Sequence, residues 1–111
     1  ENISFEQYDR ALNDQISFTK NINKLFSTYD IILSPTTVGS APNRDEKEID
    51  DCSLLWTLSL IPSLSAPLFR CPDQMPFNIH FLSSRWKDFN IITFIEYLVK
   101  KEIISPKCQI I

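Results

Sequence analysis

Hydrophobic and polar positions over residues 4–28 alternate with the period of an amphipathic α-helix. Apolar side chains recur at steps of three and four residues, and polar side chains fill the opposite face. Ser4 followed by Gln7 forms a capping-box pattern, which marks a helix start. The pattern therefore predicts one helix over residues 4–28. Its apolar positions are Phe5, Tyr8, Leu12, Ile16, Ile22, Leu25 and Phe26.

A continuous apolar run follows this helix after a very short turn. Ile31, Ile32 and Leu33 stand in a row, and three branched aliphatic residues together suit a strand buried on both faces. Pro35 ends the run because proline cannot donate a hydrogen bond to a sheet. We predict a strand at residues 30–34 that forms the centre of an α/β layer, with the other elements covering it.

A polar loop is expected over residues 36–51. Its second half, residues 44–51, holds five acidic and two basic side chains. Such a charge cluster in a loop indicates a solvated surface. A metal site would need ligands that converge from several segments, so we expect no metal ion and no cofactor.

The middle of the chain predicts a short helix. The helix would be capped by Asp50 or Asp51, run to Leu60 and be stopped by Pro62. The residues expected on its inner side are Leu54, Leu55 and Leu58.

Two strands, at residues 64–69 and 77–82, are expected to form a hairpin because only a turn beginning at Cys71 separates them. Pro67 indicates an edge or a bulge in the first of these strands. In the second strand two faces alternate: Phe77, Ile79 and Phe81 on one, Asn78, His80 and Leu82 on the other.

The chain ends on a second amphipathic pattern. Asp88 marks the start of the predicted helix, and Lys100 and Lys101 lie at its C-terminal end, where the helix dipole favours cations. Pro106 ends any continuation, and the tail to Ile111 is expected to fray. The apolar stripe of this helix is Ile91, Ile92, Ile95, Leu98 and Val99.

Composition narrows the class of protein. The 111 residues allow one domain at most, and 43% hydrophobic and 12% aromatic residues are typical of a globular chain. A net charge of −3 and a pI near 5.0 argue against a nucleic-acid partner. The longest apolar stretch, residues 54–62, is far shorter than the ~20 residues that cross a membrane. The first residue is Glu1, so we expect a fragment or a processed product.

Cysteine and glycine usage exclude two further kinds of site. Cys52, Cys71 and Cys108 are odd in number and widely spaced, which indicates neither a disulfide framework nor a zinc site. Reduced thiols are typical of a cytoplasmic protein, and we expect that location. A single glycine, Gly39, argues against a loop that cradles phosphate.

No catalytic constellation emerges from the residues themselves. His80 is the single histidine and has no serine or cysteine partner in sequence. Ser17 and Lys20 spell S-x-x-K, but they fall in the middle of the predicted helix and not at its start. Trp56 is either a core residue or a pocket wall. We therefore name no catalytic residue.

Three stretches, in this order and at these distances, resemble the C-terminal part of amidase signature enzymes. They are residues 30–37 (Asp-Ile-Ile-Leu-Ser-Pro-Thr-Thr) with Ala41-Pro42 following, residues 55–67 (Leu-Trp-Thr-Leu-Ser-Leu-Ile-Pro-Ser-Leu-Ser-Ala-Pro), and residues 75–82 (Met-Pro-Phe-Asn-Ile-His-Phe-Leu) with Arg85, Trp86, Asp88 and a closing helix. The resemblance covers nearly the whole chain. Residues 1–111 are then an incomplete C-terminal segment of an amidase domain.

The resemblance implies an α/β fold, a partial mixed sheet covered by helices, and hydrolysis of amide C–N bonds. The family uses a Ser, a second Ser in a cis peptide and a Lys, all upstream of this region. The catalytic half is thus the expected partner, with a small amide substrate, and the lone segment is expected to self-associate. Thr36 and Trp56 are expected to line the substrate pocket, because open α/β sheets bind ligands at strand ends.

Four positions depart from the family pattern. Leu60, Asn78 and Ser83 stand where glycine is usual, and His80 stands where glutamine is usual. Larger side chains at glycine positions crowd a close backbone approach. Three hypotheses follow: a segment of an amidase, a non-enzymatic remnant or interaction module, and, ranked third, the amidase-like subunit of a tRNA-dependent amidotransferase.

Overall fold

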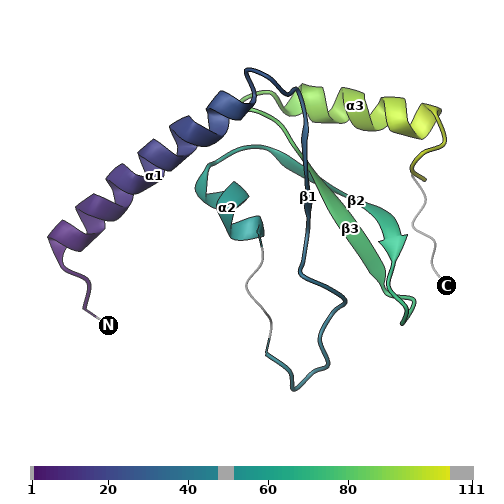
Figure 1. Cartoon of the computed structure of the whole chain (residues 1–111), viewed down its shortest axis with the longest axis horizontal. Helices are drawn as coiled ribbons and strands as arrows, with labels where there is room; N and C mark the ends of the chain where they lie inside the picture. Colours follow the sequence, from purple (N-terminus) through teal and green to yellow (C-terminus); the bar gives the residue numbers. More distant parts are fainter. Residues whose placement is uncertain (1, 48–51, 106–111) are drawn as a thin grey trace.

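The computed structural model describes residues 2–47 and 52–105. Within these ranges the chain forms three helices and three strands (Figure 1). In order they are α1 (Phe5–Leu25), β1 (Ile32–Pro35), α2 (Ser53–Leu58), β2 (Ser63–Arg70), β3 (Pro76–Leu82) and α3 (Asp88–Lys100). The α/β class expected from the sequence is confirmed.

The described strands form one sheet in the order β1-β3-β2, and β3 pairs antiparallel with both neighbours. The predicted hairpin is confirmed as β2 and β3. Its turn closes where the Cys71 N–H donates to the Met75 carbonyl at 2.9 Å. A register shift between Pro67 and Phe69 confirms the expected bulge, and β2 lies at an edge of the sheet.

The prediction that the strand after the first helix forms the centre of the sheet is wrong for the described strands. The observed β1 lies at an edge, and β3 is central. The Leu33 side chain is 58% exposed, so the run of aliphatic residues is not buried on both faces. The physical reason is that β1 pairs with a single neighbour over four residues and nothing described here covers the Leu33 face. All described pairs are antiparallel, so the parallel part of a mixed sheet is not among them.

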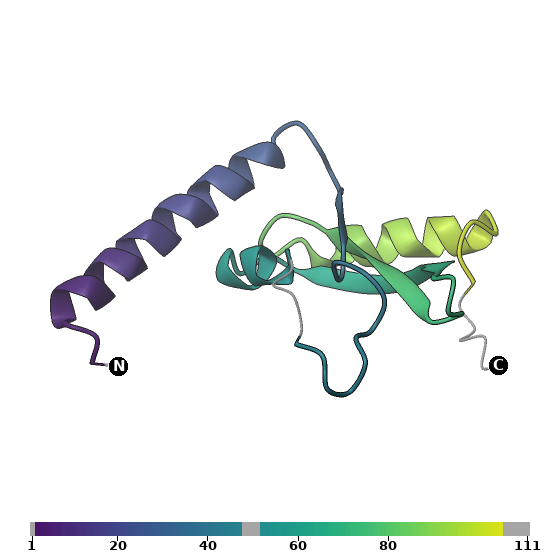
Figure 2. The same cartoon turned by 60° about the horizontal axis from the view of Figure 1, so that its bottom comes forward.

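Helix α1 begins as predicted. Ser4 Oγ accepts from the Gln7 N–H, and Gln7 Oε1 accepts from the Ser4 N–H, which completes the capping box. None of its residues is buried. Instead of covering the sheet, α1 extends away from it (Figure 2). Side-chain hydrogen bonds attach it to the rest of the chain, from Gln15 Nε2 to the Leu58 carbonyl and from the Arg85 N–H to Asn23 Oδ1.

The expected inner side of the short helix is wrong. Helix α2 spans Ser53–Leu58, and its leucines are exposed: Leu54 by 64%, Leu55 by 43% and Leu58 by 44%. No described element lies over this side of α2 to bury them. The expected aspartate caps at residues 50 and 51 lie outside the described residues. The helix ends before Pro62, because Leu60 adopts the left-handed conformation with φ 55°.

The hydrophobic core lies between α3 and one face of the sheet. Phe81 and Ala66 on the strands pack with Ile91 and Leu98 on the helix, and Ile104 closes the cluster. The rings of Phe81 and Phe94 lie 6.0 Å apart at 55°, a tilted arrangement that aromatic pairs favour. The predicted helix at Asp88 and most of its stripe are confirmed, although Ile92 is 45% exposed.

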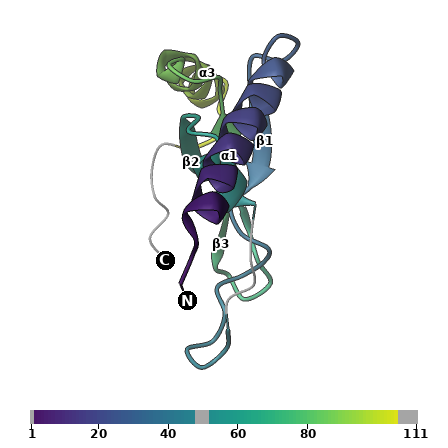
Figure 3. The same ribbon diagram turned by 90° about the vertical axis from the view of Figure 1, so that its left-hand side faces the viewer.

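The loop after β1 and the β2–β3 hairpin lie at the same end of the sheet (Figure 3). This places residues distant in sequence, such as Thr36 and Asp73, around one space. No helix in the described part of the chain is long and apolar enough to cross a membrane.

Candidate functional site

The face of the sheet opposite the core is polar along its middle. His80 on β3 stands opposite Ser34 on β1 and opposite Ser65 on β2, so these residues form one row across the strands. Ser34 is buried, His80 is half-buried and Ser65 is exposed. Because side chains alternate along a strand, Asn78 lies on the same face as His80. We call Ser34, Ser65, Asn78 and His80 the polar face.

Trp56 joins α2 to this polar face. Its indole Nε1 donates to Ser34 Oγ at 3.0 Å, and the Ser34 hydroxyl donates to the Pro35 carbonyl at 3.1 Å. Trp56 is half-buried although the leucines of the same helix are exposed. The hydrogen bond therefore fixes both the orientation of α2 and the position of the indole over β1.

Thr36 is attached to the other end of the polar face. Its N–H and its hydroxyl both donate to the Asn78 carbonyl, at 3.3 and 3.1 Å. Thr36 and Trp56, the two residues expected in a substrate pocket, thus contact the same pair of strands, β1 and β3. Thr36 lines a cavity, whereas Trp56 lies outside the lining of that cavity.

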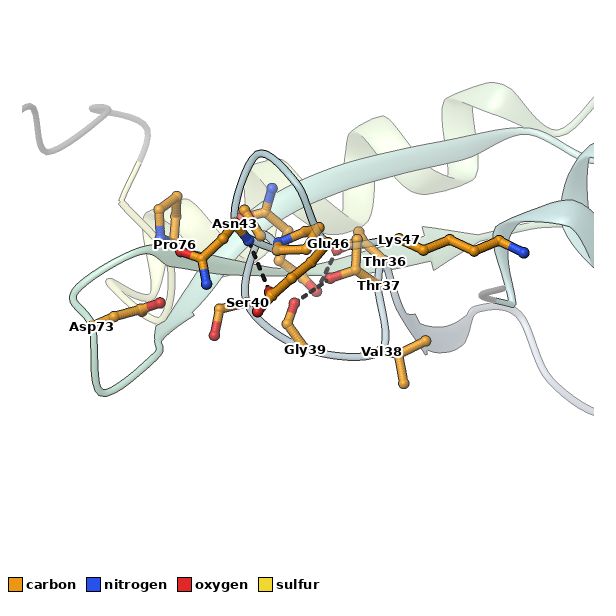
Figure 4. A pocket seen from close by; sticks show the side chains of 13 residues that line it. Thr36, Thr37, Val38, Gly39, Ser40, Asn43, Glu46, Lys47, Asp73 and Pro76 are labelled. Carbon is orange, nitrogen blue, oxygen red and sulfur yellow. Dashed lines mark hydrogen bonds between the residues drawn. The ribbon is translucent and has the colours of Figure 1, made fainter. Parts of the chain in front are cut away.

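The cavity has a volume of about 930 Å³ and lies between the loop after β1 and the hairpin (Figure 4). Residues 36–43 line it with Glu46 and Lys47 of the same loop, and Asp73, Pro76 and Asn78 line it from the hairpin side. Hydrogen bonds from Asn43, first from its side chain and then from its backbone N–H, lower the pKa of the Glu46 carboxyl. The Lys47 side chain extends away from Asn43 and Glu46 (Figure 4).

Two polar atoms on the polar face are buried and have no hydrogen-bond partner. They are Asn78 Oδ1 and His80 Nδ1. An unpaired buried acceptor of this kind costs about 1–3 kcal/mol. Native proteins rarely retain such atoms without a role or a further partner. Asn78 is thus the point where the polar face, the cavity and an unpaired acceptor meet.

The described residues contain no group of three or more His, Cys, Asp or Glu side chains that could hold a metal ion. Ser17 and Lys20 lie inside α1, as the sequence predicts, and not at a helix start. The fold brings His80 opposite Ser34 and Ser65, a relationship that sequence reasoning missed. The signal available in sequence was the alternation that places Asn78 and His80 on one face. The register that adds the serines comes from long-range pairing.

Comparison with models of known protein families finds no match. Curated relatives, all of them glutamyl-tRNA(Gln) amidotransferase subunits, are similar over most of this chain. The mitochondrial one of Aedes aegypti is 26% identical over 108 residues, which cover 86% of this chain and 22% of the relative. The one of Saccharolobus solfataricus is 31% identical over 107 residues, again 86% and 22%. That of Treponema denticola is 28% identical over 93 residues, 77% and 19%.

The chain spans about a fifth of the length of these relatives. Among solved structures, it is similar to a chain from a vestigial protein complex that bears on the origins of an s-triazine catabolic enzyme, in an inhibitor-bound state. The TM-score is 0.80 at 22% identity, and the match covers 96% of this chain and 26% of that chain. This likeness establishes a shared fold.

Proposed function

The chain belongs to the amidase signature family, and we propose that it is the C-terminal segment of an amide-hydrolysing domain whose catalytic residues lie in an upstream segment. The observation that carries the proposal is the match itself. Relatives align over 86% of this chain but only 22% of their own length. In this proposal residues 1–111 complete the sheet and one wall of the substrate pocket, while the upstream segment supplies the Ser-Ser-Lys set.

The surfaces of the segment support a missing neighbour. Helix α1 presents apolar side chains to solvent, with Phe5 81% and Ile16 53% exposed. The outer edge of β1 has no partner strand among the described residues, and Leu33 beside it is exposed. Exposed apolar stripes and open strand edges are typical of surfaces that another part of a protein covers. The upstream half of the domain is the proposed cover for both.

The pocket wall in this proposal is the end of the sheet that carries Thr36 and Trp56. Thr36 lines the cavity, and Trp56 holds Ser34 in place two residues earlier on β1. A small amide would lie against this wall while the upstream serine attacks its carbonyl carbon. The wall would then act by positioning the substrate and excluding water, which lowers the barrier without any catalytic group of its own. A cytoplasmic location, with Cys52 and Cys71 as thiols, forms part of the proposal.

Transfer of an amide nitrogen is a second candidate function. The curated relatives described above are glutamyl-tRNA(Gln) amidotransferase subunits. Their names raise this candidate above the third place that the sequence pattern assigned to it. The parent protein would then act as one component of a complex, and the amide it cleaves would supply nitrogen for transfer.

A paired assay tests the proposal. Residues 1–111 and the full-length polypeptide are compared side by side on a simple aryl amide. We expect no turnover by residues 1–111, because activity requires a nucleophile, a base and an oxyanion site together. Turnover by the full-length polypeptide supports the amidase, and nitrogen transfer to glutamyl-tRNA(Gln) in its place supports the amidotransferase. Absence of both would leave the non-enzymatic remnant as the better hypothesis.

Ser17 provides the internal control of this assay. If residues 1–111 hydrolyse the amide and a Ser17→Ala variant does not, the S-x-x-K serine is a nucleophile and the proposal is wrong. If Ser17→Ala has no effect on the full-length polypeptide, the serine is a surface residue of α1.

A further inference from the structure

The side chain of Asn78 occupies a position that neither the family pattern nor the expected pocket residues assign. It lines the cavity, and its Oδ1 atom points into the protein, where that atom is buried and unpaired. Its backbone is fixed independently, because the Thr36 N–H and hydroxyl both donate to the Asn78 carbonyl. The amide group can therefore turn about its Cβ–Cγ bond without loss of a hydrogen bond at Oδ1.

The neighbour of that amide on the same face is His80. The two residues are two apart along β3, so their Cα atoms lie ~6.8 Å apart, within the combined reach of the two side chains. His80 Nδ1 is also buried and unpaired. In the neutral tautomer that carries its proton on Nε2, Nδ1 is an acceptor, and it lacks a donor. Rotation of the Asn78 amide by 180° exchanges its oxygen for an NH₂ group and supplies that donor.

The same rotation directs the amide oxygen toward the cavity. We propose that Asn78, held in this orientation by His80, is a specificity-determining residue whose oxygen accepts a hydrogen bond from the N–H of a carboxamide substrate in the cavity. The inference rests on the proposed function for the substrate class. Asn78 contacts the substrate, and His80 acts through Asn78 as a positioning residue. No covalent step involves either residue.

Discrimination between an amide and an ester follows from this geometry. A secondary amide carries an N–H where the matching ester carries an oxygen, and that oxygen would face the Asn78 oxygen with no proton between them. A site that holds a polar group for one hydrogen bond rejects the analogue that cannot form it. Asn78→Leu has a similar volume and removes the acceptor, while the carbonyl that Thr36 uses remains.

The test measures kcat/KM of the full-length polypeptide on 4-nitroacetanilide and 4-nitrophenyl acetate. In Asn78→Leu we expect kcat/KM to fall about tenfold for the amide and to stay unchanged for the ester. His80→Leu should lose the same preference, and His80→Gln should keep it, because glutamine supplies an acceptor for the Asn78 NH₂ group. An equal fall on both substrates, or none on either, overturns the inference, as does a His80→Leu variant that retains the preference.

A binding measurement separates this inference from the proposed function. If the full-length polypeptide hydrolyses neither substrate, the proposed function fails, and binding of acetanilide and phenyl acetate decides the role of Asn78. In ¹H–¹⁵N spectra the side-chain amide signals of Asn78 are identified by their loss in Asn78→Leu. A shift of these signals with acetanilide but not with phenyl acetate supports the inference. Shifts with both compounds, or with neither, overturn it.

Discussion

The indole N–H of Trp56 and the hydroxyl of Ser34 are joined by a hydrogen bond of 3.0 Å that connects α2 to β1. Ser34 is buried at 5% exposure, so the bond lies largely out of water. We expect Trp56→Phe, which keeps a ring but loses the N–H, to lower the free energy of unfolding by about 1 kcal/mol. Circular dichroism during urea denaturation of the full-length polypeptide measures the change without relying on tryptophan emission.

A double-mutant cycle with Ser34→Ala isolates this bond. The coupling energy between the two substitutions should be about 0.5–1.5 kcal/mol, the range of a single hydrogen bond. Additive effects would mean that the two side chains do not stabilise each other. Kinetic constants that stay unchanged in Trp56→Phe and Trp56→Ala, with lower stability, would assign Trp56 to packing and remove it from the pocket wall.

The features that the sequence predicted correctly depend on neighbouring residues. The capping box of Ser4 and Gln7, the turn at Cys71 and the bulge near Pro67 all follow from local chemistry. The errors concern surroundings. Periodicity shows that Leu54 and Leu33 are apolar, but it does not show whether a neighbour covers them, and none does among the described residues. The candidate site has the same limit, because the pairing of Ser34 with His80 joins residues far apart in sequence.

The loop around the cavity should respond to acid through Glu46. Hydrogen bonds from Asn43 lower the pKa of this carboxyl below its ordinary value of 4.5, so the folded loop favours the ionised form. The stabilisation is present above pH 4.5 and is lost as the pH falls through the lowered pKa. The amide proton of Asn43, which donates to Glu46 Oε2 at 3.0 Å, should shift over that interval. In Glu46→Gln the shift should be absent, and a shift that persists there would assign the titration to another group.

The apolar stripe of α1 should make residues 1–111 self-associate when they are isolated. Leu12 and Ile16 on this stripe are 39% and 53% exposed. A contiguous apolar surface of this kind promotes association in water. We expect Leu12→Lys with Ile16→Lys to reduce the apparent mass measured by light scattering and to reduce binding of an apolar dye. Asn13→Lys with Ser17→Lys adds the same charge to the opposite face and serves as the control. Equal effects from the two pairs would mean that charge alone, and not the stripe, controls association.

Leu60 provides a test of one departure from the family pattern. It stands where the family usually has glycine, and its φ of 55° explains that preference, because the left-handed conformation costs a residue with a Cβ atom about 1 kcal/mol. Its side chain is 53% exposed, so little buried apolar contact opposes the substitution. We expect Leu60→Gly to raise the free energy of unfolding by about 0.5–1 kcal/mol in urea denaturation. Leu54→Gly, at a 64% exposed position inside α2, is the matched control and should lower it by about 1 kcal/mol. If both glycines destabilise the protein equally, the backbone at Leu60 carries no strain and the departure has another cause.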